Sequence, residues 1–511
     1  MQASQAGKYA PATSTSGSPL INATSPGIFM VPMSMVMHSR WRRVCSTPIV
    51  AAAAFSAAWA APLALEPRDS ALPRFSGNKT YDLGSLIDLG LATHPATRAS
   101  WFQARAAAAA VGEARAPYYP KLTAGFEGGS DQWYTPAANA PDNFRREQAT
   151  TIFSLEYLLL DFGRRAADVQ RTLAALDAAG LIYERELQKV VFDVQRAYFA
   201  HEAALLRLTA ATALVEAARM ADQTIRKEVT TGLSATPELL AAQKNLLEAD
   251  YERESAGALV RTTLGDLCVA AGLPANSRLT LAGSSLPTST AGLRESAGKL
   301  IDSAIASRPD LAARVADVRE SEAATRRARA DFLPEVRLEG KYAYSAFEYD
   351  ARAGKVHGSY AEDLNGYGAF LVAKWDLFDG FERVSRLKKK KAEEEASREV
   401  LDQARLDATR DVWTAYQDNL SAAARVDYAE GFVASAEESF KATRKAYETG
   451  LATVAEFSEA AGQLAFARST RADAVAGYST SLAALAFAAG MPPVKEGLPQ
   501  SREAAKKKDS R

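Results

Sequence analysis

The chain repeats one order of landmark residues twice. Ala114–Ala116 precedes Pro120 in the first half, and Ala328–Ala330 precedes Pro334 in the second, so the numbering is offset by 334 − 120 = 214. Later landmarks keep an offset of 379 − 161 = 218. They are the pairs Asp161 and Asp379, Tyr198 and Tyr416, Gly232 and Gly450, and Pro274 and Pro492. An offset that changes by only four (218 − 214) predicts one architecture built twice, with the length difference in a surface loop.

The repeat divides the chain into six predicted parts. Residues 81–274 and 297–492 are two structural repeats, each expected to hold a helix, two strands and two long helices, and 275–296 is the linker. Residues 1–60 are an N-terminal extension and signal peptide, because Arg40–Arg43 precede an apolar run that ends near Ala60. Met37 is the expected true start. The alternative to a signal peptide is that the apolar run forms a cytoplasmic alanine-rich helix. Residues 61–80 are the mature N-terminal segment, and 493–511 are a disordered tail.

Period-two alternation predicts two strands in each repeat. Apolar or aromatic residues alternate with charged or polar residues from Glu335 to Tyr344, and less cleanly from Tyr367 to Trp375. The first repeat alternates in the same way around Leu122–Phe126 and Phe153–Tyr157. Strands of about 10 residues with one apolar and one polar face are typical of outer-membrane barrels. A soluble two-sided sheet is the alternative. Four strands cannot close a barrel, since the smallest have about 8, so the membrane reading requires an oligomer.

Two long segments predict rod-like helices. Residues 163–231 and 382–449 contain no proline, so each is expected to form one helix of roughly 100 Å at 1.5 Å per residue. Apolar residues recur every three or four positions along each rod, which indicates a coiled-coil seam. The seam positions are Leu187, Val191, Val194, Tyr198, Leu205, Leu208, Thr212 and Val215 in the first rod, and Val412, Tyr416, Ala423, Val426, Val433, Phe440 and Tyr447 in the second.

Each rod ends at a Thr-Gly-Leu turn, after which a second helix reverses direction. Glycine suits the left-handed conformation that ends a helix, so Gly232 and Gly450 are the predicted turn residues. The second helices begin near Pro237 and Thr453. Their first turns are expected to carry Glu238, Glu456 and Glu459, where the helix dipole favours carboxylates.

This order of elements resembles the TolC-like outer membrane channel family, the outer membrane factors of tripartite exporters. The joint spacing carries the resemblance from Tyr81 to Pro492: the duplicated order, the prolines before the first strands, the aspartates at the strand exits and the two glycine turns. The resemblance implies a mixed α and β membrane protein that forms a homotrimer. Its 12 strands, four per protomer, would form one outer-membrane β-barrel continued by a long periplasmic α-helical barrel.

The resemblance also implies roles for residues near the turns. Gly232, Leu233, Gly450 and Leu451 match the tip that meets a periplasmic adaptor protein, Glu456 and Glu459 match the acidic rings of the closed aperture, and Tyr447 and Glu238 match a latch. Ala452 stands where a relative has the arginine of a second latch. A hydroxyl latch predicts that Tyr447→Phe raises ion conductance. Ordinary helix caps and solvated acids are the alternatives at the turns.

The expected function is passive transport through the outer membrane, opened at the tip by the adaptor and energised by an inner-membrane ABC transporter or proton-driven pump. Relatives serve type I secretion of RTX toxin-like proteins, of the cyclolysin-export type, as well as multidrug efflux. Cys45 precedes the apolar run, whereas a lipoprotein cysteine would follow it, so no lipid anchor is expected, and this favours type I secretion over multidrug efflux. A periplasmic coiled-coil scaffold without a pore is the alternative of another class. No motif indicates an enzyme, a cofactor or a metal site, and the histidines lack metal-ligand spacing. With 61 basic and 61 acidic residues, the chain offers no electrostatic argument for nucleic acid.

Overall fold

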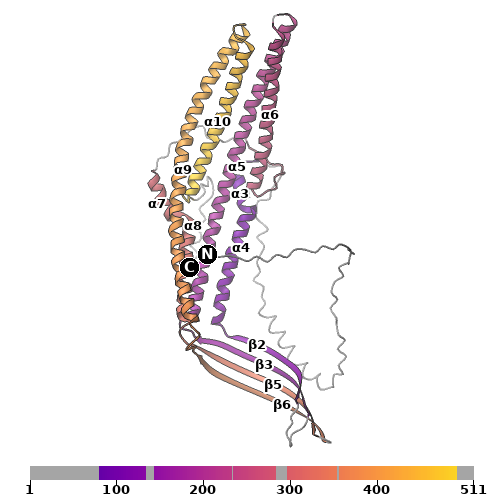
Figure 1. Cartoon of the computed structure of the whole chain (residues 1–511), viewed down its shortest axis with the longest axis vertical. Helices are drawn as coiled ribbons and strands as arrows, with labels where there is room; N and C mark the ends of the chain where they lie inside the picture. The colour runs from indigo at the N-terminus through magenta and orange to yellow at the C-terminus, as the bar shows by residue number, and fades with distance from the viewer. Residues whose placement is uncertain (1–79, 134–142, 233, 283–295, 354–355, 492–511) are drawn as a thin grey trace, which may run out of the picture. The chain divides into compact units, whose positions relative to one another are not determined.

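The computed structural model describes residues 80–133, 143–232, 234–282, 296–353 and 356–491, all within the unit Pro67–Arg511. The expected signal peptide, the Met37 start, residues 61–79, Leu233, most of the linker and the tail lie outside the described residues. Within this unit the helices run side by side, and four strands continue from one end of them (Figure 1).

The two halves of the described chain have the same order of elements. The first half consists of α3 (Leu83–Thr93), α4 (Pro95–Arg115), the short 3-10 helix η1 (Ala116–Tyr118), β2 (Lys121–Trp133), β3 (Asn143–Leu160), α5 (Arg164–Thr230) and α6 (Thr236–Ala270). The second half consists of α7 (Ala297–Ser307), α8 (Pro309–Ala330), β5 (Glu335–Ala353), β6 (Val356–Lys374), α9 (Glu382–Glu448) and α10 (Val454–Ala488). The duplication read from the residue spacing is therefore visible in the elements themselves.

Two details differ from the sequence-based expectation. Each half begins with two helices where one was expected, because His94 and Arg308 are extended and each precedes a proline, which disfavours helical geometry at the preceding residue. The predicted linker also contributes β4 (Thr280–Leu281), which pairs in parallel with β1 (Thr80–Tyr81). Tyr81 lies in a core with Leu86, Leu89, Val194, Tyr198 and Leu267.

The four long strands form one antiparallel sheet in the order β2-β3-β5-β6. They are longer than the alternation predicts, with 13 residues in β2, 18 in β3 and 19 in each of β5 and β6. The apolar alternation marks only the half of each strand that is nearer the helices, which explains why the sequence predicts shorter strands. In the described part of the chain, no strand pairs with the outer edge of β2 or of β6.

The strand register places apolar side chains of all four strands on one face of the sheet. Ala124, Phe153, Tyr342 and Tyr367 occupy successive paired positions across the sheet. The apolar face carries Leu122, Phe126, Phe153, Leu155, Leu338, Tyr342, Tyr367 and Leu371. The opposite face, named the polar face, carries Lys121, Thr123, Glu127, Ser154, Glu156, Glu339 and Lys341 over the same length. It also carries apolar residues, among them Ile152 of β3 and Leu364, Phe370 and Val372 of β6.

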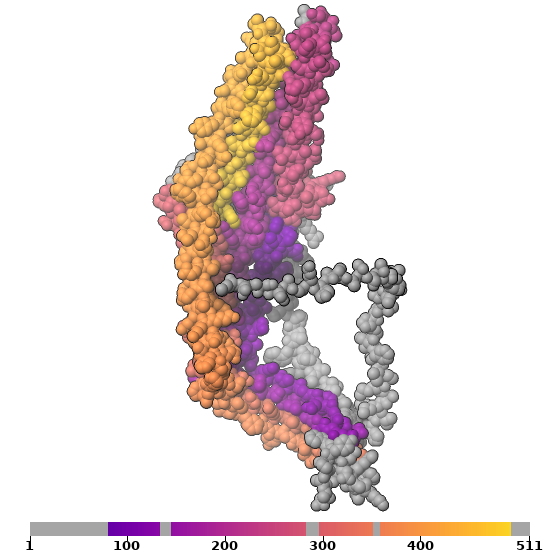
Figure 2. All heavy atoms as spheres, viewed as in Figure 1, coloured from indigo at the N-terminus to yellow at the C-terminus, as the bar shows by residue number. Residues whose placement is uncertain are grey.

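The long helices α5 and α9 each contain 67 residues, which corresponds to roughly 100 Å. α5 packs against both α6 and α10, and near the sheet against α4 and α8. Figure 2 shows α9 and α10, in orange and yellow, in contact along the length of the shorter helix α10. None of the helices in the described ranges combines the length and the hydropathy needed to cross a membrane.

The expected seam of α5 is only partly correct. Val191, Val194, Tyr198 and Val215 are buried, but Leu205 is 37% exposed. Farther along α5 the buried positions are mostly alanines, because a helix with two neighbours buries two stripes and needs small residues for close approach. The buried alanines of α5 near and beyond Leu205 are Ala203, Ala204, Ala210, Ala211, Ala217, Ala218 and Ala221.

Candidate functional site

The turns that join α5 to α6 and α9 to α10 have the predicted glycine geometry. Gly232 and Gly450 have φ angles of 77° and 73°, in the left-handed region. The Gly450 N–H donates to the Tyr447 carbonyl at 3.0 Å, and the Leu451 N–H donates to the Ala446 carbonyl at 2.8 Å, which is a Schellman cap. No atom lies within 4 Å of a Cβ built on either glycine, and Leu451 is 84% exposed. The turns therefore present open surface.

The two predicted ring carboxylates lie on the exposed surface of α10. Glu456 forms a capping box with Thr453, whose backbone N–H donates to Glu456 Oε2 at 2.7 Å. This hydrogen bond lowers the pKa of Glu456 below its usual value and keeps the carboxylate ionised. Glu459 is one turn farther along, in the second turn rather than the expected first, because α10 begins only at Val454.

The predicted latch residues do not contact each other through a hydrogen bond in this structure. Glu238 accepts a hydrogen bond from the Ser234 hydroxyl of its own turn. The Tyr447 ring stacks on Phe457, with 4.9 Å between ring centroids. The Tyr447 hydroxyl is buried without a hydrogen-bond partner among the described residues. Burial raises the pKa of Tyr447. The Thr224 hydroxyl of α5 donates to the Met220 carbonyl of its own helix. The latch stays a prediction, and the observed contact of Tyr447 is made by its ring.

Apolar contacts hold the four helices together next to the turns. Ile225 of α5, Ala242 of α6 and Val454 of α10 are buried in one cluster, against which Tyr447 of α9 packs. Just beyond the cluster, a groove of about 1140 Å³ runs between α6 and α10 over α5. The exposed side chains of Leu240, Leu247, Tyr251 and Glu459 are among those that line the groove.

A second set of polar contacts, not predicted from the sequence, joins the helix breaks to the ends of α6 and α10. Thr93 Oγ1 donates to the Ala271 carbonyl at 3.2 Å, and Ser307 Oγ donates to the Ala489 carbonyl at 3.1 Å. A Cβ on Gly490 would lie 2.8 Å from Cγ of Arg308, so only glycine permits this approach. The sequence contains a signal for these contacts at the helix breaks. Thr93-His94-Pro95 and Ser307-Arg308-Pro309 are related by the same offset of 214 (307 − 93) as the other landmarks of the first part of the repeat.

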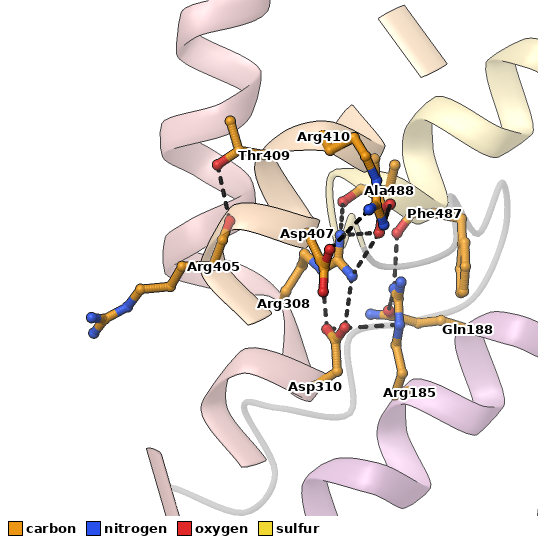
Figure 3. Close-up of polar contacts among 11 residues, drawn as sticks. Arg185, Gln188, Arg308, Asp310, Arg405, Asp407, Thr409, Arg410, Phe487 and Ala488 are labelled. Atoms are coloured by element: carbon orange, nitrogen blue, oxygen red, sulfur yellow. Dashed lines mark hydrogen bonds and ion pairs between the residues drawn. The ribbon is translucent and has the colours of Figure 1, made fainter. Parts of the chain in front are cut away.

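In the second repeat, Arg308 is the centre of an ion network (Figure 3). Its guanidinium donates to Asp310 Oδ2 at 2.7 Å, to Asp411 Oδ2 at 3.4 Å and to the Ala488 carbonyl at 3.3 Å. Arg185 of α5 donates to the Phe487 carbonyl at 2.8 Å. The network thereby ties α5, α8, α9 and α10 together.

The charge of Asp310 depends on this network. Burial by itself would raise the pKa of Asp310, but the hydrogen bond from Arg308 and the charges of Arg185 and Arg308 lower it below its usual value. In the described ranges, no group of three or more His, Cys, Asp or Glu side chains is placed to hold a metal ion.

The comparisons with known proteins identify the family. The family described as "Outer membrane efflux protein" matches residues 86–272 and 300–491, more than half of the chain. The chain belongs to this family. It is an outer-membrane channel with a periplasmic helical extension, and channels of the family work as trimers with an adaptor and an inner-membrane transporter.

Individual relatives agree with this assignment. The channel is 30% identical to Protein CyaE of Bordetella pertussis over 407 residues, which cover 79% of this chain and 83% of that protein. The solved outer-membrane channel OprN has a TM-score of 0.68 at 20% identity and covers 80% of this chain and 90% of its own. The CmeC outer membrane channel of Campylobacter jejuni has a TM-score of 0.68 at 15% identity, with coverage of 84% and 89%.

Proposed function

We propose that this channel subunit serves type I secretion and exports an RTX toxin-like protein. The observation that carries the proposal is the 30% identity to Protein CyaE, sustained over 407 residues. The solved channels OprN and CmeC share the fold at only 20% and 15% identity. The similarity to CyaE supports the cyclolysin type of export that the family resemblance implies.

The channel acts as a passive conduit and not as an enzyme. Three copies complete a barrel by pairing the outer edge of β2 with that of β6 in the next copy, since unpaired strand edges are not tolerated in lipid. The apolar face of the sheet contacts outer-membrane lipid, and the polar face lines a water-filled lumen. The alternation of the two faces in β2, β3 and β5 supports this orientation, and β6 follows it less regularly because Phe370 and Val372 lie on its polar face.

The helix turns are the docking positions for a periplasmic adaptor. Gly232 and Gly450 lie in open space and Leu451 is exposed, so a partner reaches them without displacing other side chains. Leu233 is the fourth of the proposed docking positions. Docking separates the helices next to the turns and opens the channel, while an inner-membrane ABC transporter, or a proton-driven pump, supplies the energy.

The acidic residues near the turns select cations at the aperture. Three copies bring together six carboxylates (3 × 2) from Glu456 and Glu459, and both residues are exposed in the single chain. A ring of carboxylates in a narrow pore attracts cations. The lowered pKa of Glu456 supports an ionised ring at the pH of the periplasm.

Deleting the gene in its native host tests the exported substrate. Loss of one large secreted protein without a change in drug sensitivity is expected. Drug hypersensitivity with normal protein secretion would instead assign the channel to multidrug efflux. Planar-bilayer recordings of the purified protein test the pore itself, because a non-conducting assembly would favour the periplasmic scaffold.

A further inference from the structure

The sheet changes its polarity along the strands. Near the helices, the apolar face of β3 and β5 carries mainly aliphatic and aromatic residues, with Thr151 among them, up to the pair Ala149 and Ala346. Beyond that pair the same face carries Glu147 opposite Glu348, and then Arg145 opposite Asp350. Charged side chains in these positions are compatible with water but not with hydrocarbon. The distal part of the sheet, remote from the helices, therefore extends beyond the apolar band (Figure 1).

The polar face changes in the opposite sense at the same level. Asp131, Arg146, Tyr349 and Tyr360 form one continuous row of paired positions across β2, β3, β5 and β6. Phe347 lies two residues from Tyr349 on the same face. Aromatic rings thus collect on the polar face where the strands leave the apolar band, whereas nearer the helices the same face carries the ring of Phe370 of β6.

These side chains form a stacked cluster. The rings of Tyr349 and Tyr360 have centroids 4.5 Å apart at an interplanar angle of 21°, and Phe347 and Tyr349 have centroids 5.8 Å apart. The guanidinium carbon of Arg146 lies 5.7 Å from the centroid of Phe347, and Arg146 also pairs with Asp131. Tyr360 remains 55% exposed. The cluster therefore presents aromatic ring faces, and the guanidinium of Arg146, to a ligand that lies against the polar face.

The cross-strand stack of Tyr349 on Tyr360 contributes to the stability of the sheet, but it still leaves Tyr360 more than half exposed. An aromatic ring that faces water leaves apolar area exposed, and on β5 and from Lys121 to Asp131 of β2 the other polar-face residues are charged, hydroxyl-bearing or small. An unfolded polypeptide in transit has exposed apolar and aromatic side chains. Such side chains stack on aromatic rings and on guanidinium groups with little dependence on sequence. An exported polypeptide is therefore the occupant that fits the cluster.

We propose that Phe347, Tyr349 and Tyr360, held in position with Arg146, form a contact site for the exported polypeptide where it leaves the channel. The inference rests on the proposed function in protein export, because it takes the polar face to line the lumen. It adds a substrate-binding surface at the end of the sheet opposite to the helix turns.

Single-channel recording with a defined probe tests this site. The probe is a flexible Gly/Ser peptide with Tyr and Phe at regular intervals, and the matched peptide of the same length has Ala at those positions. Each is added on the hairpin side, so that it reaches the site without passing the helix turns. In the unmodified trimer, the aromatic peptide is expected to interrupt the current for longer than the alanine peptide. In the triple variant Phe347→Ser, Tyr349→Ser, Tyr360→Ser, the interruptions are expected to shorten at least tenfold.

The control variant carries Tyr342→Ser and Tyr367→Ser, a paired set of aromatics on the same two strands but on the apolar face. It is expected to retain the long interruptions. If the triple variant fails to assemble, the single change Tyr360→Ser at an exposed position replaces it, with a smaller shortening expected.

Equal interruption times in the unmodified and serine-substituted trimers would overturn the contact site. Similar shortening in the control variant would also overturn it, because the effect would then not belong to the polar face. A trimer that conducts no current contradicts the proposed channel function instead. The two failures are therefore distinguishable.

Discussion

At the scale of single residues, four glycines with the same backbone conformation meet different requirements. Gly232, Gly272, Gly450 and Gly490 all have positive φ angles and end long helices. At Gly450 a Cβ would meet nothing within 4 Å, whereas at Gly490 it would lie 3.0 Å from the Cα of Arg308. The turn glycine is required by its backbone angle only. Glycine is required at position 490 both by the backbone angle and by the close approach of Arg308.

Alanine substitutions separate these two requirements. Gly450→Ala is expected to lower the free energy of unfolding by about 1 kcal/mol, the strain of a left-handed residue with a Cβ. Gly490→Ala is expected to lower it by about 3 kcal/mol, since overpacking against Arg308 is added. Urea unfolding in detergent, followed by circular dichroism, measures both. Equal losses would show that the close approach at Gly490 is not maintained in solution.

The Arg308 network predicts a pH dependence. The pKa of Asp310 is lower in the folded protein than in the unfolded chain. Its contribution to the free energy of unfolding is therefore fully present above the unfolded pKa, near about 3.9, and is lost as the pH falls through the folded pKa. Asp310→Asn is expected to reduce stability at pH 7 by about 1 kcal/mol, since solvent partly screens this carboxylate. The difference between the two proteins should shrink below about pH 3.9 in melting curves. A difference that does not vary with pH would exclude this charge effect.

At the scale of elements, the helix ends at the turns are held by ring and methyl packing. Tyr447 stacks on Phe457 and packs against Ile225 and Val454, so residues from α5, α9 and α10 meet at one point. Separation of these helices must break the cluster. The stability of the cluster therefore sets how readily the turns move apart.

Two substitutions of Tyr447 distinguish the ring from the hydroxyl. Tyr447→Ala removes the stack and is expected to raise single-channel conductance of the trimer. Tyr447→Phe keeps the stack, and because the hydroxyl has no hydrogen-bond partner among the described residues, conductance is expected to stay near that of the unmodified trimer. Higher conductance of Tyr447→Phe would restore the hydroxyl latch with Glu238 that the family resemblance implies.

The alanine-rich contacts between α9 and α10 predict intolerance of larger residues. Ala467 of α10 is fully buried against Ala436 and Leu464. Ala467→Leu is expected to lower the free energy of unfolding by about 1–3 kcal/mol, because the helices must separate to admit the larger side chain. Ala434→Leu, at an exposed position of α9, is the control in the same urea titration. A larger loss in the control than at Ala467 would contradict the observed packing.

At the scale of the whole molecule, the sheet is incomplete in one chain. The outer edges of β2 and β6 have no partner strand in the described part of the chain, and the apolar face carries exposed side chains such as Leu122, Phe126 and Tyr367. The unpaired strand edges are expected to pair with other copies of the chain, and the apolar face is expected to contact lipid. The folded protein should therefore be an oligomer in the membrane.

Gel electrophoresis tests this expectation directly. Protein extracted from outer membranes in mild detergent is expected to migrate as a trimer in SDS without heating and as a monomer after boiling. The physical reason is that edge-to-edge strand pairing in three copies removes every exposed edge. A water-soluble monomer without a β signal in circular dichroism would contradict the assembly.

The sequence by itself determined the duplicated order of elements, the two 67-residue helices, the glycine turns and the alternation of the sheet. These features are local, because proline and glycine placement and residue periodicity act through nearby backbone geometry. Tertiary structure alone decided that alanines supply most of the buried positions of α5 beyond Leu205, that Tyr447 meets Phe457 and that the Arg308 network joins four helices. Such contacts join residues far apart in the chain, and which of them form depends on how the helices pack, which periodicity does not encode.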